Sequence, residues 1–418
     1  MPSPLSPATI ALVKATVPAL EVYGSAITRR MYERLFQDPA IRDLFNQSHH
    51  GETGSQPKAL ANAVLAYARH IDDLGALAGA VERIAQKHVT LAILPAHYTS
   101  VAEALLGAIR DVLGDAATPE ICAAWGEAYW FLAGILIDRE AAIYHDHAAR
   151  PGGWTGWRDF RIESVTAESE TIRSFVLVPV DGGKVLRHEP GQYLGLRLDL
   201  PGDGAQDPGV LKRNYSISCA PNDRAYRITV KREAAPGRPA GLVSSWLHDT
   251  AHPGTVLGVA APAGDFALDR ASTAPVVLVS GGVGLTPMMS MLETIHAETP
   301  ARPTWYVHGA LNGRVHAMAG HARRLAAECP AIRLHTIYEA PEAADRLGVD
   351  HDAVGRITPD WLAAHTPAAE AIYYLCGPKP FLASLVHGLA RLGVPAARIR
   401  YEFFGPADEL VEEARQAA

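Results

Sequence analysis

The chain has 418 residues, of which 48% are hydrophobic and 20% are charged, a composition typical of a folded globular protein rather than a disordered one. At roughly 150 residues per domain, this length predicts two or three domains. The formal net charge of −7 argues against nucleic acid or an anionic membrane as the main partner.

The cysteines and the apolar segments indicate in which cellular compartment the protein is expected. Cys122, Cys219, Cys329 and Cys376 show no CxxC spacing, so we expect neither a thiol-bound metal nor a disulfide framework, and reduced thiols suit a cytoplasmic protein. The longest apolar run, AYWFLAGILI at 128–137, is shorter than the roughly 20 residues that span a membrane. The N-terminus carries prolines where a signal peptide has its basic region. We therefore expect a cytoplasmic protein without a membrane span.

Residues 1–145 show a helical period of apolar positions almost throughout, which predicts an all-α block. In the stretch IAQKHVTLAILPAHY, His88 continues the helical stripe of Leu77, Val81 and Ile84, so a histidine points where apolar side chains pack. A buried histidine with a local hydrogen-bond partner is more common than a haem ligand. The stripe alone therefore favours a core histidine.

Two further residues of this block bear on the role of His88. Glu140 continues the apolar stripe of Tyr129 and Leu136, where an unpaired carboxylate is costly. Tyr98 ends the stretch that contains His88. Both need a buried partner, and a metal-ligating imidazole offers one because its second ring nitrogen donates a hydrogen bond. The alternative for Tyr98 is an ordinary aromatic residue with its hydroxyl at the surface.

The Pro/Gly cluster AARPGGWTGW at 148–157 ends the helical pattern, and the apolar period then changes from about 3.6 to about 2 residues. The segments SFVLVPV, GQYLGLRLDL, RNYSIS and AYRITVKRE are separated by turn residues and are typical of strands. Residues 157–268 therefore predict a small antiparallel β-barrel or sandwich.

Four residues of these strands suit a ligand that carries a diphosphate and a planar ring. Arg213 can neutralise a diphosphate, Tyr193 and Tyr215 can lie flat on a ring, and Ser216 can bond a ring heteroatom. Each of them also has an ordinary interpretation as a strand residue.

From about residue 273, strands alternate with helices, which predicts a parallel sheet. SGGVGLTPMM at 280–289 lies between a strand and a helix, where backbone N–H groups can receive a diphosphate. This segment lacks the third glycine of the dinucleotide fingerprint, so a simple tight turn is an equal alternative. A second strand-to-loop turn, YLCGPKPF at 374–381, favours nucleotide binding, because such folds bind ligands at the carboxyl ends of their strands.

Taken in order, the motifs RNYS, GLVSSWLH, GGVGLTP, CGP and YEFFGP resemble those of ferredoxin-reductase-like flavoproteins. Together with an N-terminal helical block that carries QKH, the whole chain resembles the bacterial flavohaemoglobin family. The resemblance implies a globin domain at 1–145, an FAD-binding antiparallel β-barrel at 157–268 and an NAD(P)-binding α/β domain with a parallel sheet at 273–418. It implies haem b with its iron, FAD and NADH or NADPH as cofactors.

The resemblance also implies roles for single residues. It makes His88 the iron ligand, with Tyr98 and Glu140 behind it, and places Tyr32 and Gln56 on the other haem face. The remaining cofactor-binding residues that it implies are Phe45, Leu60 and Lys87 near the haem; Tyr193, Arg213, Asn214, Tyr215, Ser216, Gly241, Val243 and Ser244 at the flavin; Gly282, Val283, Gly284, Leu285, Thr286, Pro287, Cys376, Gly377 and Pro378 at the nicotinamide dinucleotide; and Glu402, Phe403, Phe404, Gly405 and Pro406 in the terminal motif.

The activity implied by the resemblance is that of a nitric oxide dioxygenase, which converts NO and O₂ to nitrate with electrons passed from NAD(P)H through FAD to haem. A peroxide reductase is an alternative of the same class, and an O₂ or NO sensor or store is an alternative of another class. A fused reductase argues against a sensor, because a binding protein needs no continuous supply of electrons. We expect a monomer whose small-molecule substrates are O₂ and NO.

Two points of the resemblance leave specific expectations. Lys87 and Glu402 are expected to meet where the globin and reductase halves join. No acidic residue after TWYVHGA is positioned for the adenosine ribose, and Arg314 suits a 2′-phosphate, so the choice between NADH and NADPH stays open. The segment REAAPGRPAGLVSSWLH is longer and richer in proline than the family's usual turn, and Phe403 stands where members of the family often carry cysteine.

Overall fold

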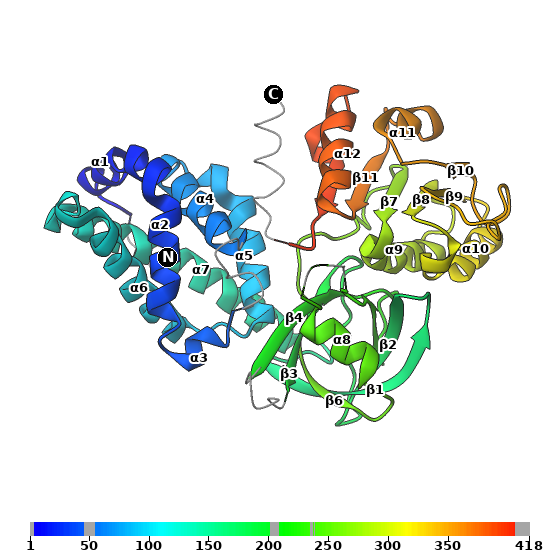
Figure 1. Cartoon of the computed structure of the whole chain (residues 1–418), viewed down its shortest axis with the longest axis horizontal. Coiled ribbons are helices and arrows are strands. Elements are labelled where there is room, and N and C mark those ends of the chain that lie inside the picture. Colours follow the sequence, from blue (N-terminus) through cyan, green and yellow to red (C-terminus); the bar gives the residue numbers. More distant parts are fainter. Residues whose placement is uncertain (1–3, 46–54, 201–208, 235–236, 238, 406–418) are drawn as a thin grey trace.

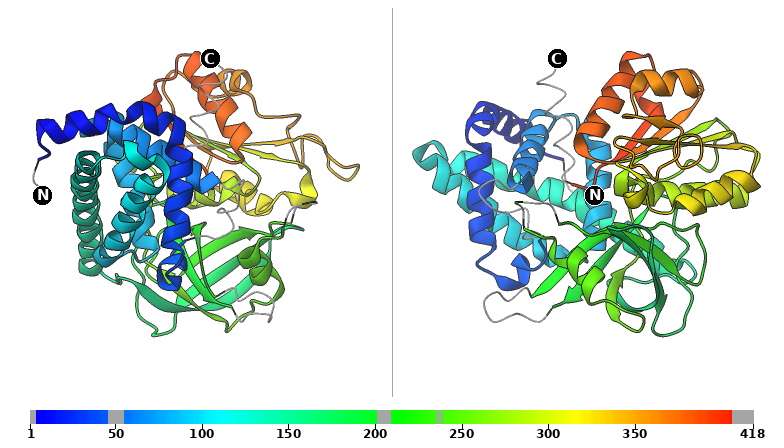
Figure 2. Two further views of the ribbon diagram at one scale, coloured as in Figure 1. Left: turned by 60° about the vertical axis from the view of Figure 1, so that its left-hand side comes forward. Right: turned by 45° about the vertical axis from the view of Figure 1, so that its right-hand side comes forward.

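The structure is a computed structural model that describes residues 4–45, 55–200, 209–234, 237 and 239–405. Figure 1 shows three bodies in chain order: a group of helices, a small β-barrel, and an α/β body above the barrel. The turned views in Figure 2 show the same three bodies around a common centre. The predicted fold class, an all-α domain followed by an antiparallel barrel and a parallel α/β domain, is confirmed.

The first body is helical throughout the part that the structure describes. Its helices are α1 (Pro7–Ala15), α2 (Val17–Leu35), α3 (Pro39–Arg42), α4 (Ser55–Arg69), α5 (Ala78–Thr90), α6 (Pro95–Leu113) and α7 (Pro119–Ala149), with 3-10 turns at Leu74–Leu77 and Gly114–Ala116. Proline lies in the first turn of α1, α2, α3, α6 and α7, where its missing N–H is not needed. Buried side chains such as Ile27, Tyr67 and Trp125 form the core of this body.

Helix α7 is the longest element, and by length and composition it is apolar enough to cross a membrane. Two bent helix pairs within the described residues pass the same test if each pair is counted as one span. In the structure, however, α7 packs Trp125, Leu136 and Ile143 inside the helical body. Glu140 is buried near its middle and bonds to other residues of this body. Part of the apolar surface of α7 is therefore buried inside the helical body.

The second body is a six-stranded antiparallel sheet with the order β4-β3-β6-β1-β2-β5. Its elements are β1 (Trp157–Ala167), β2 (Ile172–Pro179), β3 (Tyr193–Asp199), β4 (Val210–Ser216), β5 (Tyr226–Lys231), α8 (Leu242–Asp249) and β6 (Val256–Ala260). Phe160, Phe175 and Tyr226 lie in its core, and α8 covers that core with Val243 and Leu247. The sequence predicted β2 to β5, but it did not indicate β1, β6 or α8.

The third body is a six-stranded parallel sheet with the order β10-β9-β8-β7-β11-β12. Its elements are β7 (Val276–Gly281), α9 (Leu285–Glu298), β8 (Thr304–Ala310), α10 (Ala319–Glu328), β9 (Ile332–Tyr338), β10 (Ala353–Val354), α11 (Pro359–His365), β11 (Ile372–Cys376), α12 (Lys379–Arg391) and β12 (Ile399–Glu402), with 3-10 turns at Gly282–Gly284, Gly313–Val315 and Ala396–Arg398. One face of the sheet packs against residues of α9 and α10, and the other packs against α11 and α12. The strand order reverses at β7, which has β8 on one side and β11 on the other.

The helical body and the barrel meet at the end of α5. A Cβ atom added to Gly195 would lie 2.1 Å from the Thr90 carbonyl oxygen. The two backbones are therefore so close that only glycine fits at position 195. Gly264 N donates a hydrogen bond of 2.9 Å to Gln86 Oε1 across the same junction. The last turns of α5 are therefore held directly against the barrel.

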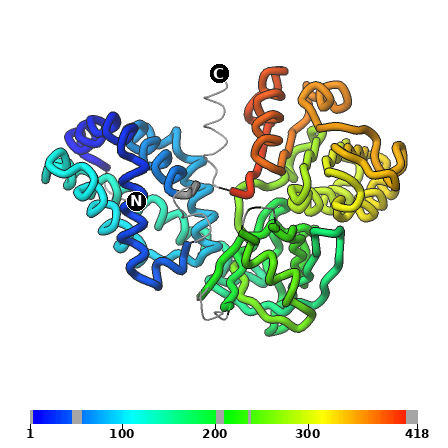
Figure 3. Tube along the Cα trace, in the orientation of Figure 1, coloured from blue at the N-terminus to red at the C-terminus, as the bar shows by residue number. Residues whose placement is uncertain are grey.

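The barrel and the α/β body share a network of charged side chains. Glu293 of α9 pairs with Arg227 of β5 at 2.6 Å and with His321 of α10 at 2.6 Å. Its other oxygen accepts a bond of 2.8 Å from Ala220 N. Figure 3 shows the α/β body above the barrel and the helical body to the side of both. The charged network therefore holds the α/β body on the barrel.

Candidate functional site

His88 lies near the end of α5, and its ring is held by two residues from other helices. His88 Nδ1 lies 2.7 Å from Glu140 Oε1 and 3.1 Å from the Tyr98 hydroxyl. The Tyr98 hydroxyl donates to the same Glu140 oxygen at 2.5 Å. The Glu140 side chain is only 3% exposed, whereas that of His88 is 30% exposed. Glu140 therefore accepts a hydrogen bond from Nδ1–H, which leaves the Nε2 atom of the ring available to a ligand.

Tyr98 is buried in a hydrophobic cluster with Ala85, Val89 and Leu136. Burial and the adjacent Glu140 raise the pKa of the Tyr98 hydroxyl above its usual range, so it stays protonated and acts as a donor. Tyr129, which the sequence placed only on an apolar stripe, fixes the backbone of Tyr98 by donating to its carbonyl at 2.6 Å. The three residues behind His88 thus form a connected set.

The apolar side chains that precede His88 on its helical stripe are not fully buried. Leu77, Val81 and Ile84 are each only partly buried, as is His88 itself, although a stripe of a core helix is normally covered. Tyr129 and Leu132 of α7 are also partly buried against the same cluster. A half-covered apolar surface next to a histidine with a free Nε2 fits a planar apolar group such as haem.

The residues expected on the other haem face lie close to one another. Tyr32 is buried, and its ring lies 5.6 Å from the ring of Phe45 and 5.4 Å from that of Phe36. Leu60 in α4 is partly buried against the same core. Gln56 belongs to α4, but its side chain lies outside the described residues. The structure therefore places Tyr32, Phe45 and Leu60 in the helical body as expected, and leaves Gln56 a prediction.

The residues expected to hold the flavin lie on two neighbouring strands of the barrel. Tyr193 of β3 stands directly opposite Ser216 of β4, and Gly195 stands opposite Asn214. The buried Oδ1 atom of Asn214 has no hydrogen-bond partner among the described residues. Buried polar atoms are rarely left without a partner, so this atom fits an edge of a bound flavin.

Arg213 and Tyr215 are two positions apart in β4, so their side chains lie on the same face of the strand. The guanidinium of Arg213 donates to the Lys212 carbonyl at 2.7 Å, and burial lowers its pKa from the ordinary value. Burial also raises the pKa of Tyr215. The arginine that the sequence assigned to a diphosphate is thus a partly desolvated cation, which binds an anion more strongly than an exposed one does.

The N-terminus of α8 contains the segment expected at the flavin diphosphate. Gly241 precedes the helix, and Ser244 Oγ is already engaged, since it donates to the Gly241 carbonyl at 3.1 Å and accepts from Glu233 N at 3.2 Å. The buried Oγ of Ser245, by contrast, has no partner in the described part of the chain. Val243 is buried in the barrel core. The structure therefore indicates Ser245, which the sequence reasoning did not select, as the hydroxyl available to a diphosphate at this helix N-terminus.

The two glycine-containing turns of the α/β body lie against each other. Ser280 at the end of β7 pairs with Cys376 at the end of β11, and a Cβ added to Gly284 would lie 2.2 Å from the Cys376 carbonyl oxygen. Gly282 has a φ of +54°, which favours glycine. Thr286 is buried at the start of α9 and donates to the Val283 carbonyl at 3.2 Å. Leu285, Pro287, Gly377 and Pro378 belong to the same two turns. The two turns therefore lie side by side at the carboxyl ends of β7 and β11, where such folds bind nucleotides.

The terminal motif brings Glu402 to the barrel. Glu402 pairs in register with Cys376, and burial together with the nearby Asp265 raises the pKa of the Glu402 carboxyl to about 8. Burial, and after it the nearby Glu402, raises the pKa of Tyr193. The buried Oε2 atom of Glu402 has no partner among the residues that the structure describes. Phe403 packs on the core between β11 and α12, Phe404 is exposed and Gly405 follows it, and Pro406 lies outside the described residues.

The expected meeting of Lys87 and Glu402 at the junction stays a prediction. Among the described residues, no ion pair joins them, and the charge that acts on Glu402 is that of Asp265. Lys87 keeps an exposed surface, although crowding by protein atoms lowers the pKa of its ammonium. Gln86, one residue earlier, contacts the barrel. Consecutive helical residues point about 100° apart, so Gln86 and Lys87 face different directions.

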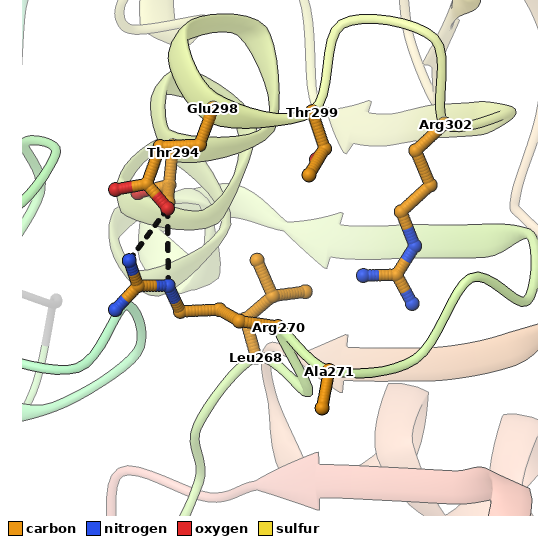
Figure 4. A pocket seen from close by; sticks show the side chains of 7 residues that line it. All are labelled: Leu268, Arg270, Ala271, Thr294, Glu298, Thr299 and Arg302. Carbon is orange, nitrogen blue, oxygen red and sulfur yellow. Dashed lines mark hydrogen bonds and ion pairs between the residues drawn. The ribbon is translucent and has the colours of Figure 1, made fainter.

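A surface pocket lies away from these residues, at the linker that follows the barrel (Figure 4). It is lined by Leu268, Arg270, Ala271, Thr294, Glu298, Thr299 and Arg302. Arg270 is paired with Glu298 at 2.6 Å, and Arg302 donates to the carbonyls of Asp269 and Ala274. These bonds tie the linker to α9 and to the start of β8, and no predicted site residue lines the pocket. Its arginines therefore have a structural role.

Comparisons with known proteins agree with this geometry. A family model described as Globin matches residues 29–136, and one described as Oxidoreductase NAD-binding domain matches residues 278–387. Among solved structures, the chain is similar to a flavohaemoglobin from Malassezia yamatoensis determined with bound FAD and haem. That likeness has a TM-score of 0.83 and 26% identity, and it covers 96% of this chain and 100% of the other. A FAD/NAD-binding domain of nitric oxide dioxygenase from Vibrio cholerae has a TM-score of 0.54 and 37% identity, over 60% of this chain and 99% of that one.

Relatives named "Flavohemoprotein" match nearly the whole chain. The protein from Xylella fastidiosa (strain Temecula1) is 52% identical over 409 residues, which is 98% of this chain and 99% of that protein. The protein from Bordetella pertussis is 48% identical over 403 residues, which is 96% of this chain and 98% of that protein. With a globin-type ligand set, a flavin barrel and a dinucleotide fold in one chain, the protein belongs to the flavohaemoprotein family and is an oxidoreductase that uses haem, FAD and a nicotinamide nucleotide.

Proposed function

We propose that the protein is a nitric oxide dioxygenase, which converts NO and O₂ to nitrate with electrons from NAD(P)H. The observation that carries this proposal is the bonded set of His88, Glu140 and Tyr98 in a chain that also contains a complete reductase. The Vibrio cholerae domain, named as part of a nitric oxide dioxygenase, resembles the reductase half of this chain at 37% identity.

The role of Glu140 and Tyr98 follows from their bonds to His88. A carboxylate that accepts the Nδ1 proton makes the imidazole a stronger electron donor through Nε2. Tyr98 donates to the same carboxylate oxygen, which fixes the direction of the carboxylate and limits how much negative charge it presents. The ring is thus both oriented and made electron-rich, as activation of an O–O bond requires.

The residues of the reductase half position two cofactors. Tyr193, Ser216 and Asn214 lie on adjacent strands where a planar ring can be held, and the turns at Gly282 and Gly377 lie at the carboxyl ends of β7 and β11. When bound, FAD would accept one hydride from NAD(P)H and pass its two electrons one at a time to haem iron, where O₂ and NO would react. The junction at Gln86 and Gly195 keeps the helix of His88 beside the barrel that carries the flavin residues.

The experiment is one aerobic assay in which pulsed NO, O₂, nitrate and NAD(P)H are measured together. A dioxygenase uses one electron for each nitrate, so we expect about two nitrates per NAD(P)H, with O₂ required. A peroxide reductase consumes about one NAD(P)H per peroxide and forms no nitrate. A sensor or store binds ligand with negligible turnover. A nitrate yield near zero contradicts the dioxygenase proposal.

We further propose that the protein is a cytoplasmic monomer without a membrane span. All four cysteines are free thiols, and Cys122, Cys329 and Cys376 are buried, as in proteins of a reducing compartment. Size-exclusion chromatography with light scattering of the purified protein, and fractionation of the cells that contain it, test these two statements.

A further inference from the structure

The sequence left the choice between NADH and NADPH open. In the structure, the residues relevant to this choice lie in the loops that follow β8 and β9. A dinucleotide whose diphosphate lies at the N-terminus of α9 extends to both sides of β7. Glu402 of β12, which acts on Tyr193 at the expected flavin site, and Cys376 of β11 both lie on one side of β7. The nicotinamide must reach the flavin on that side, so the adenosine half lies on the other side, over β8 and β9.

The loop after β8 contains the arginine that the sequence assigned to a 2′-phosphate. Arg314 Nη2 lies 2.8 Å from Glu342 Oε1, and its Nε lies 3.2 Å from Glu170 Oε2. Glu342 follows β9, and Glu170 belongs to the turn between β1 and β2 of the barrel, where its backbone N–H donates to the Arg314 carbonyl at 3.2 Å. The guanidinium is therefore already bound from two directions by carboxylates.

Further bonds hold these carboxylates in place. The amide of Asn312, which is 4% exposed, donates from Nδ2 to Glu342 Oε1 at 3.2 Å. Asp345 Oδ2 accepts from the backbone N–H of Gly313 at 3.2 Å and from that of Glu342 at 2.7 Å. Two carboxylates thus contact one guanidinium, and Asp345 holds the backbone around them, at the loop where the second strand of a dinucleotide fold contacts the adenosine ribose.

We propose that Glu342 and Glu170 make this site select NADH over NADPH, because they occupy the guanidinium of Arg314 and repel a 2′-phosphate. Glu342 then serves as the acceptor for the unmodified ribose, a role that in dinucleotide folds belongs to an acidic residue near the end of the second strand. Here the acid comes instead from the loop after the third strand, which explains why no acidic residue follows TWYVHGA in the sequence. The inference rests on the proposed function only in that a nicotinamide nucleotide supplies the electrons.

The test compares the double variant Glu170→Gln/Glu342→Gln with the unchanged protein, both loaded with haem and FAD. Calorimetry gives the dissociation constants of NAD⁺ and NADP⁺, and anaerobic stopped-flow gives flavin reduction by NADH and NADPH. Removing two carboxylates next to a doubly charged phosphate is expected to shift the NADP⁺/NAD⁺ preference by about tenfold or more toward NADP⁺, since one surface charge pair contributes about 1 kcal/mol in water.

Two further proteins make the result specific to Arg314. Adding Arg314→Ala to the double variant is expected to remove most of the gain, because the freed guanidinium is the group that binds the phosphate. The control variant Glu163→Gln/Asp249→Asn removes two exposed carboxylates that pair with Arg224 and Arg232 on the barrel, and it is expected to leave the preference unchanged.

Three results overturn the inference: equal affinity of the unchanged protein for NAD⁺ and NADP⁺, an unchanged preference in the double variant, or a full gain in the triple variant. The single variant Arg314→Ala provides a check that does not depend on the folding of the double variant, because it keeps both carboxylates and should disfavour NADP⁺ further. Nucleotide binding and flavin reduction are measured without NO. A failed nitrate assay with an intact nucleotide preference therefore refutes the proposed function but not this inference.

Discussion

His88 Nδ1 and Glu140 Oε1 lie 2.7 Å apart although 52 residues separate them along the chain. The carboxylate reaches the imidazole from α7, and Tyr98 of α6 donates to the same oxygen. Three helices therefore determine the direction in which Nε2 points. A ring that is fixed from behind needs no rearrangement when a metal binds in front of it.

We expect His88→Ala to abolish haem retention and to leave the reductase half folded with its flavin. The reason is that the ligand belongs to the helical body, whose core of Ile27, Tyr67 and Trp125 is separate from the barrel core. The measurement is the haem absorption band beside the flavin content of the purified variant. Full haem occupancy in this variant refutes the assignment.

Glu140→Gln is expected to keep haem but to lower NO turnover by roughly 10- to 100-fold, as the loss of a partner behind a metal ligand commonly does. The amide cannot accept the Nδ1 proton as a charged group, so the imidazole becomes a weaker electron donor. The iron–histidine stretching frequency, measured by Raman spectroscopy, should fall. Glu127→Gln, which changes a carboxylate of the same helix bonded to Thr9, is the control and should leave this frequency unchanged.

Tyr32→Phe is expected to release O₂ faster while haem and flavin contents stay normal. A hydrogen bond to a charged acceptor contributes about 1.5–3 kcal/mol, which corresponds to a factor of about ten to over a hundred in the dissociation rate. Flash photolysis or rapid mixing measures that rate. Tyr67→Phe removes the hydroxyl that donates to the Ala128 carbonyl in the same body and should not alter it. An unchanged rate in Tyr32→Phe makes Tyr32 a packing residue beside Phe45.

Gln86→Leu removes the acceptor of the Gly264 N–H at the junction of the helical body and the barrel. A buried donor without a partner costs about 1–3 kcal/mol, so the two bodies should hold each other less firmly. Stopped-flow traces are expected to show several-fold slower flavin-to-haem transfer and unchanged flavin reduction by the nucleotide. The same substitution at the exposed Gln37 should have no effect. Equal slowing of both steps argues against a role at the junction.

His188 makes stability depend on pH. It is 1% exposed, its Nε2 lies 3.0 Å from the Cys219 carbonyl oxygen, and burial lowers its pKa to about 3. The unfolded chain takes up a proton near the ordinary pKa of 6.5, so the stability that neutral His188 contributes is present above pH 6.5 and is lost as pH falls toward 3. At pH 5 this loss amounts to about 2 kcal/mol.

His188→Gln keeps a side-chain amide donor but has no proton to gain. We therefore expect the urea midpoint of the barrel, followed by flavin fluorescence, to fall less between pH 7.5 and pH 5.0 in this variant than in the unchanged protein. His308 and His316, whose pKa values burial also lowers, remain in both proteins and cancel in the comparison. Identical pH dependence in the two proteins excludes His188 as a contributor.

Much of this architecture could be predicted from the sequence because it depends on local periodicity. The stripes through His88 and Glu140 have a helical period, and apolar residues alternate with polar ones in the sequence of β5, so element types follow from spacing. The two glycine turns of the α/β body were predictable for a similar reason, since the carboxyl ends of parallel strands lie at one edge.

The parts that could not be predicted depend on which distant segments meet. Strand β1 has mixed burial along its length and is a strand because it pairs with both β2 and β6. Gln86 contacts the barrel because of the rotation of α5 in the assembled structure. From the sequence, Arg314 was expected to suit a 2′-phosphate. Its pairing with two carboxylates from distant loops, which the sequence did not indicate, is the basis for proposing the opposite preference.

The close approach of Thr90 to Gly195 also determines which amino-acid substitutions the junction can accept. Because backbone meets backbone there, the separation of the two bodies is set by bond lengths and van der Waals radii and not by side-chain rotamers. Exposed residues that make no bond across the junction can therefore be exchanged without altering the separation of the two backbones at this point. Any residue larger than glycine at position 195 would push the bodies apart by the size of its first carbon atom, and electron transfer rates fall steeply with distance.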